Sequence, residues 1–179
     1  MRVVRLTPVD ERLLQPLLSV AVAETKPDEV MPPIEAAPGW SDARRDAFCD
    51  FYRSHHAGLG GPRRTLMYAI LCDGDVVGMI RMARRDETDT METGMWLGKS
   101  ARGQGIGVAA LRLLLGEAAL TGAHRVVAET TAANVAAIGM LRRCGAAFTV
   151  NGPQVHAEIR IGKALSRADN RKTEPGQNS

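Results

Sequence analysis

Residues 92–107 read Glu-Thr-Gly-Met-Trp-Leu-Gly-Lys-Ser-Ala-Arg-Gly-Gln-Gly-Ile-Gly, a strand-like run that leads into a glycine-rich turn. An apolar stretch with the composition of a helix follows this turn and ends near Gly122. Glycines let a backbone approach a ligand closely, and the free N–H groups at a helix N-terminus attract anions. The turn at residues 102–107 is therefore predicted to hold a phosphate or pyrophosphate group.

The glycine spacing excludes two common phosphate-binding loops. A dinucleotide-binding loop needs glycines at its first, third and sixth positions, but a loop starting at Gly103 or Gly105 has Val108 or Ala110 in sixth place. A P-loop that ends in Gly-Lys-Ser needs another glycine five residues earlier, where this chain has Thr93. A different anion-binding arrangement is required.

The pattern Arg-x-x-Gly-x-Gly at residues 102–107 resembles the acetyl-CoA pyrophosphate loop of the Gcn5-related N-acetyltransferase (GNAT) superfamily. Residues 92–97 are similar to that family's Glu-x-Gly-x-Trp-Leu strand, and residues 134–148 resemble its second motif. The resemblance covers roughly residues 65–162. Within the superfamily the chain looks most like the RimJ/RimL-type ribosomal-protein N-terminal acetyltransferases and the antibiotic (aminoglycoside) N-acetyltransferases.

The resemblance implies an α/β (α+β) fold for a single domain over residues 1–162. It has a mixed, mostly antiparallel central sheet, helices on both faces, and a V-shaped cofactor cleft between strands that end near Leu97 and Glu129. Acetyl-CoA is implied as co-substrate, and no metal. The glycine turn would hold the pyrophosphate, while the backbone of the preceding strand would pair with the pantetheine arm and point an N–H at the thioester oxygen. The residues implied in cofactor binding are Trp96, Leu97, Arg102, Gly103, Gln104, Gly105, Ile106, Gly107 and Asn134.

Acetyl transfer to an amine requires a proton acceptor, because an alkyl ammonium has a pKa of ~10 and cannot attack while protonated. Glu92, which aligns with the family's strand glutamate, is the predicted catalytic base, acting directly or through a water; Glu129 is the reserve candidate. Two positions depart from the family pattern. Leu141 stands where many members have a tyrosine that protonates the thiolate, and Ala137 replaces a serine, so the general acid is unassigned.

The acceptor is predicted to bind the least family-like part of the chain, residues 24–62. Residues 1–62 carry seven basic and nine acidic side chains, for a balance of −2, whereas residues 63–162 carry twelve and nine, for +3. Acidic side chains near an aromatic ring suit a cationic amine. Asp28, Glu35 and Trp40 are the predicted substrate-binding residues. The adjacent pair at residues 55–56 does not predict a metal site, because neighbouring side chains point apart on a helix.

Composition limits the remaining classes of function. The chain has 179 residues and 4% aromatics, with a net charge of +3, so it predicts one globular domain and no nucleic-acid-binding surface. No apolar stretch approaches the ~20 residues of a membrane span, and we expect no membrane partner. Three widely separated cysteines and a start without a signal-like core favour the cytoplasm. Residues 163–179 are predicted to be a polar, disordered tail.

The sequence and its family resemblance thus predict acetyl-CoA-dependent N-acetylation of a small cationic amine by a monomer or homodimer, with an aminoglycoside-type antibiotic as the leading acceptor. One alternative is a protein N-terminal acetyltransferase. The other is a non-catalytic acyl-CoA sensor, which the missing tyrosine and serine keep open.

Overall fold

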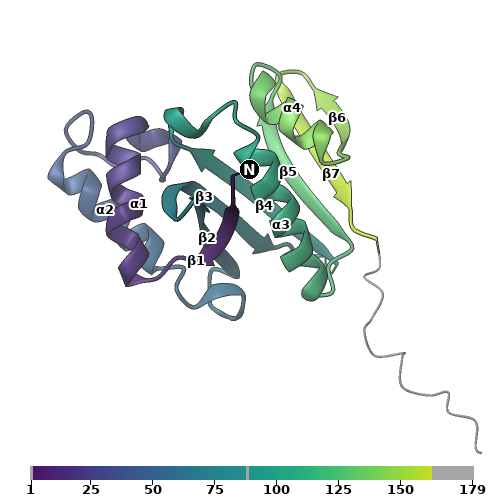
Figure 1. Cartoon of the computed structure of the whole chain (residues 1–179), viewed down its shortest axis with the longest axis horizontal. Coiled ribbons are helices and arrows are strands. Elements are labelled where there is room, and N and C mark those ends of the chain that lie inside the picture. Colours follow the sequence, from purple (N-terminus) through teal and green to yellow (C-terminus); the bar gives the residue numbers. More distant parts are fainter. Residues whose placement is uncertain (1, 88, 163–179) are drawn as a thin grey trace, which may run out of the picture.

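The computed structural model describes residues 2–87 and 89–162; the predicted tail at residues 163–179 lies outside the described residues. A seven-stranded sheet with the order β1-β2-β3-β4-β5-β7-β6 organises the fold (Figure 1). All neighbouring strands are antiparallel except β4 and β5. The mixed, mostly antiparallel sheet predicted from the sequence is confirmed. Its strands are β1 (Val4–Pro8), β2 (Thr65–Cys72), β3 (Asp75–Arg84), β4 (Thr90–Leu97), β5 (Arg125–Thr131), β6 (Ala147–Asn151) and β7 (Gln154–Arg160).

Four α-helices pack around the sheet: α1 (Glu11–Glu24), α2 (Asp42–Arg53), α3 (Ile106–Leu120) and α4 (Val135–Arg143). Three of them begin at a side-chain cap, in which Asp10, Ser41 or Asn134 accepts a backbone N–H of the first turn. Helix α3 differs, because its N-cap is a glycine that has no side chain to accept those hydrogen bonds. Three short 3-10 turns, η1 (Pro27–Glu29), η2 (Gly58–Gly60) and η3 (Lys99–Ala101), complete the described elements.

The sheet separates two hydrophobic cores. On one face, α3 and α4 bury Ile106, Leu111 and Leu141 against the strands. On the other face, α1 and α2 bury Leu17 and Phe48 against β2, β3 and β4. This second core contains no residue of β5, β6 or β7, so that half of the sheet is left without a helical cover from α1 and α2. Figure 1 shows α1 and α2 gathered beside the β2–β3 half and α4 beside the β5–β7–β6 half.

Strands β4 and β5 pair over three positions only, residues 90–92 of β4 with residues 125–127 of β5. Residues 93–97 continue along β3, and residues 128–131 continue along β7. The two strands therefore part after Glu92 and Val127. We call residues 93–97 and 128–131, the segments that follow this point, the β4–β5 divergence.

Candidate active site

The backbone of β4 has hydrogen-bonding groups that face the β4–β5 divergence. The N–H of Gly98 donates to the carbonyl of Val77 in β3 at 2.9 Å. Because backbone groups alternate in direction along a strand, those of Trp96 and Gly94 also point to β3. The groups of Leu97, Met95 and Thr93 point the opposite way, where β5 no longer pairs. An extended ligand arm could pair with this strand edge as a further strand would.

The glycine turn lies directly beyond this edge. Gly103 and Gly105 have positive φ angles of 72° and 79°, a conformation that L side chains rarely adopt. A Cβ built on either residue meets no atom within 4 Å, so the backbone surface is open on that side. The first intrahelical donor of α3 is Ala109, and no side chain caps the helix. The N–H groups of residues 106–108 are therefore available to an anion.

Side chains fix the position of this turn relative to β4. Arg102 donates from Nε to the carbonyl of Leu97 at 3.0 Å, and Gln104 donates to the carbonyl of Ser100. Ile106 is 2% exposed and anchors the start of α3 in the core. At Gly107 a Cβ would lie 3.1 Å from the sulfur of Met140, so this glycine allows α3 to pack closely there. The structure brings the predicted turn residues together beside the end of β4.

Two other predicted cofactor residues have structural partners. The indole of Trp96 is buried on the α1–α2 side and donates to the hydroxyl of Tyr52 at 2.9 Å. Its backbone also points to β3, so neither group faces the divergence. Asn134 caps α4 by accepting the N–H of Ala137 at 3.1 Å. The backbone groups that face the divergence are therefore those of Leu97 and Met95 and not those of Trp96.

Glu92 lies at the point where β4 and β5 part, but arginines hold its carboxylate. Arg81 and Arg85 each donate to one of its oxygens at 2.6 Å. Burial opposes ionisation of Glu92, yet the hydrogen bonds and charges of the two arginines outweigh it and lower the pKa of this carboxyl. A carboxylate with a lowered pKa accepts a proton less readily. The role of Glu92 as catalytic base stays a prediction.

The predicted acceptor residues lie in and beside the α1–α2 connection. Asp28 is exposed and pairs with Arg44 at 3.0 Å, while Glu35 is exposed. The indole of Trp40 donates to the carbonyl of Thr25 at 2.9 Å and its ring packs edge-on against Phe48. The side chain of Trp40 thus packs against the α1–α2 core. Asp28 already has a cationic partner in Arg44, and the binding of an acceptor by Asp28 and Glu35 stays a prediction.

The two positions that depart from the family motif lie on α4. Leu141 is 2% exposed and belongs to the core under α4, and Ala137 is partly buried in the first turn of the helix. Neither side chain has a proton to give, so the general acid stays unassigned.

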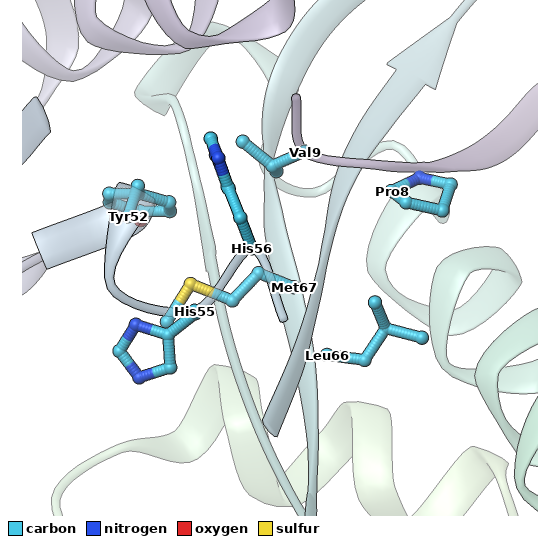
Figure 2. A pocket seen from close by; sticks show the side chains of 7 residues that line it. All are labelled: Pro8, Val9, Tyr52, His55, His56, Leu66 and Met67. Atoms are coloured by element: carbon cyan, nitrogen blue, oxygen red, sulfur yellow. The ribbon is translucent and has the colours of Figure 1, made fainter. Parts of the chain in front are cut away.

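The histidine pair at the end of α2 lines a small pocket with Tyr52, Val9 and residues of β2 (Figure 2). His55 is buried, and its Nδ1 lies 2.7 Å from the carbonyl of Phe51, whereas His56 is exposed. The lining residues belong to the β1, α2 and β2 region and include none from the β4–β5 divergence. Within residues 2–87 and 89–162, no three His, Cys, Asp or Glu side chains are grouped as metal ligands would be.

Arg81 is a further residue of this region that no sequence motif indicates, and its guanidinium lies over Gly94. A Cβ on Gly94 would come within 3.0 Å of the Nε of Arg81, so this glycine makes room for the arginine. Arg81 is paired directly with Gly94 in the β3–β4 ladder. The pairing of Arg81 with Gly94 would have been predictable only once the β3–β4 register was known.

The fold places a glycine turn with available backbone N–H groups beside an unpaired strand edge, and sequence comparison identifies the class of protein as an acyltransferase. The model of the Acetyltransferase (GNAT) family matches residues 25–146, and the chain belongs to this family. It is an acetyl-CoA-dependent N-acetyltransferase. A comparison with curated protein sequences gives no match.

Three solved structures illustrate the likeness of fold. The ribosomal L7/L12 α-N-protein acetyltransferase RimL in complex with coenzyme A is 19% identical, with a TM-score of 0.69 over 90% of this chain and 96% of that one. The microcin C7 self-immunity acetyltransferase MccE, in complex with acetyl-CoA and AMP, is 15% identical, with a TM-score of 0.67 over 88% and 92%. The spermidine/spermine N-acetyltransferase SpeG from Vibrio cholerae is 14% identical, with a TM-score of 0.64 over 93% and 98%.

None of the helices among the described residues is long and apolar enough to cross a membrane.

Proposed function

We propose that this protein transfers the acetyl group of acetyl-CoA to a primary amine of a small cationic acceptor, with an aminoglycoside-type antibiotic as the leading candidate. The observation that carries the proposal is the adjacency of two features: the outward-facing backbone of Met95 and Leu97, and the uncapped N-terminus of α3. The first suits a pantetheine arm and the second a pyrophosphate.

The chain's own residues would supply binding and orientation. Backbone N–H groups at residues 103–108, together with the charge of Arg102, would hold the pyrophosphate. A backbone N–H at the end of β4 would donate to the thioester oxygen as negative charge develops there. A preorganised donor of this kind is worth about 3 kcal/mol. Acetyl-CoA itself supplies an activated acyl group with a thiolate as leaving group.

The charge distribution supports a cationic acceptor. Residues 1–62 have a balance of −2, opposite in sign to the +3 of residues 63–162 that contain the glycine turn. Asp28 is 69% exposed and Glu35 is exposed, so both can meet a polyamine or an aminosugar. Such contacts between partly exposed charges contribute mainly selectivity.

A protein N-terminal amine is the second candidate, and a different observation favours it. Arg81 and Arg85 lie on the face of the sheet that the acceptor would approach, and Arg85 is half exposed. These guanidinium groups suit an acceptor that carries a carboxylate, such as an acidic peptide.

A screen for thiol release tests both candidates and the non-catalytic alternative. Acetyl-CoA is mixed with the protein and kanamycin, spermidine, or a peptide with a free N-terminus and acidic residues. Turnover with kanamycin or spermidine supports the cationic proposal, whereas turnover with the peptide alone supports the second candidate. Acetyl-CoA binding without thiol release from any amine would identify a sensor.

A further inference from the structure

A histidine–glutamate pair lies beside the β4–β5 divergence. The Nδ1 of His156 on β7 lies 2.6 Å from a carboxylate oxygen of Glu129 on β5. A carboxylate only accepts hydrogen bonds, so the hydrogen of the neutral imidazole sits on Nδ1 and the lone pair on Nε2. The Nε2 atom has no hydrogen-bond partner within residues 2–87 and 89–162. The pair therefore presents a free basic nitrogen held in one tautomer.

The strand register places this pair at the site. Glu92 pairs with Val127, the last paired position of β4 and β5. Glu129 follows two residues later, about 7 Å along β5, and its side chain is on the same face of the sheet as that of Glu92. Had the β4–β5 pairing continued, Glu129 would face Gly94. His156 is directly opposite Glu129 in the β5–β7 ladder.

The amine has to approach from this face. Helices α3 and α4 and their core fill the opposite face, where Ala157 and Ile159 of β7 are buried. The face that carries Glu129 and His156 has no cover from the α1–α2 core beyond β4. The side chain of His156 is 39% exposed and that of Glu129 is 55% exposed. Both can meet a bound acceptor without any rearrangement of the fold.

We infer that His156, oriented by Glu129, accepts the proton that the acceptor ammonium must lose before it attacks. This inference rests on the proposed function and names a group for the proton transfer other than Glu92. Both oxygens of Glu92 are engaged by arginines, whereas Nε2 of His156 is free. The carboxylate of Glu129 also stabilises the imidazolium that forms.

The protons and bonds balance in this scheme. An N–H bond of the ammonium breaks and an Nε2–H bond of His156 forms. The neutral amine nitrogen then bonds to the carbonyl carbon and the C–S bond breaks. A second proton of the amine passes to the departing sulfur, so N-acetylated amine and thiol leave. His156 returns its proton to water, and no further reactant is needed.

Other charged groups lie on this face of the sheet, with ion-pair partners of their own. Glu158 is two residues further along β7 and pairs with Arg160 at 3.2 Å, while the residue opposite His156 on β6 is the uncharged Thr149. Glu129 is the charged group in contact with His156; the other charged groups on this face include Arg125 on β5, Glu158 and Arg160 on β7, and Arg81, Arg85 and Glu92 across the divergence.

The test compares His156→Gln, Glu129→Gln and the matched control Glu158→Gln, which removes a carboxylate from the same strand and face. Rates are measured with acetyl-CoA and whichever of kanamycin, spermidine or the acidic peptide the wild type acetylates. His156→Gln should lower kcat about 100-fold or more near neutral pH, because general bases contribute that much. Glu129→Gln should lower it about tenfold, and Glu158→Gln should leave it unchanged.

Two readouts separate proton transfer from a structural effect. The loss in His156→Gln should shrink as the pH rises toward the pKa of the amine, because free amine then needs no base. Acetyl-CoA affinity measured by calorimetry should stay at the wild-type value in all three variants. A wild-type kcat in His156→Gln, or a loss that is the same at every pH, would overturn the inference. A wild type that binds acetyl-CoA but acetylates no amine would instead overturn the proposed function, and this inference with it.

Discussion

The carboxylate of Glu24, the last residue of α1, accepts two hydrogen bonds from Ser100, one from the backbone N–H at 2.7 Å and one from the hydroxyl at 2.9 Å. Ser100 belongs to η3, the short turn between β4 and the glycine turn. These hydrogen bonds lower the pKa of Glu24, the backbone bond most. The α1–α2 part of the molecule is thereby tied to the segment that would bind the cofactor.

We predict that Glu24→Gln destabilises the fold and weakens cofactor binding together. Replacing a charged acceptor by a neutral one at this partly exposed site should cost about 1 kcal/mol. The pKa of Glu24 is lower in the folded state, so its contribution is present above about pH 4.5 and is lost as the pH falls through the folded pKa. Urea unfolding between pH 3 and 7 measures this. The variant should show less loss of stability on acidification than the wild type, and an identical profile would contradict the prediction.

A bulky residue in the glycine turn should abolish cofactor binding and leave the fold intact. Gly105→Val forces a β-branched side chain into a left-handed conformation and into the open space above the turn. We expect acetyl-CoA affinity to fall at least 100-fold, a change measured by calorimetry. Gly116→Val is the matched control, because Gly116 lies exposed within α3 and a Cβ there meets no atom within 4 Å. Unchanged affinity in a folded Gly105→Val protein would refute the assignment of the turn.

The parts of the fold that can be predicted from the sequence are those set by residues adjacent in the chain, such as tight turns. The Asp73-Gly74 turn between β2 and β3 was predictable because both residues adopt positive φ angles, 54° and 101°, as a tight hairpin turn requires. The start of α1 is harder to predict, because Thr7-Pro8 has the composition of a helix start, with a proline in the first turn. The structure has both residues in β1, because Asp10 caps the helix by accepting the N–H groups of Arg12 and Leu13 at 3.0 and 3.1 Å.

The site was predictable in part, for a similar reason. The glycine turn is a contiguous motif, so residues 102–107 could be singled out from the sequence and interpreted through their resemblance to a family motif. The partners of Glu92 and the pairing of His156 with Glu129 depend on the registers of β3, β4, β5 and β7, which sequence patterns do not specify. The direction of Trp96 likewise depends on which face of β4 packs against α2.

Glu92→Gln separates a proton-acceptor role from an anchoring role. A catalytic base at Glu92 predicts a loss of about 100-fold near neutral pH that shrinks at alkaline pH. Because Arg81 and Arg85 hold this carboxylate and we assign the proton to His156, we expect a smaller loss that does not vary with pH. Steady-state rates from pH 6 to 10 make the comparison. A loss that disappears at high pH would return the proton transfer to Glu92.

The same variant should change acid stability. The folded-state pKa of Glu92 is lowered despite its burial, so its ion pairs stabilise the protein above about pH 4.5 and are lost as the pH falls through the folded pKa. Glu92→Gln should therefore unfold more readily than the wild type at pH 7, and the difference should narrow toward pH 3. A difference that persists at pH 3 would mean that packing, rather than charge, is lost.

Neutralising the exposed acids of the α1–α2 connection should weaken the acceptor alone. Asp28→Asn with Glu35→Gln removes two negative charges, so the KM of a cationic acceptor should rise about tenfold while acetyl-CoA affinity stays unchanged. Added salt should raise the wild-type KM in the same direction, because exposed charge pairs are screened. The control pair Asp75→Asn with Glu87→Gln removes two charges outside residues 24–62. Equal effects of the two double variants would show that net charge, rather than an acidic acceptor site, selects the amine. A loss of acetyl-CoA affinity in the first would place these acids on the cofactor side.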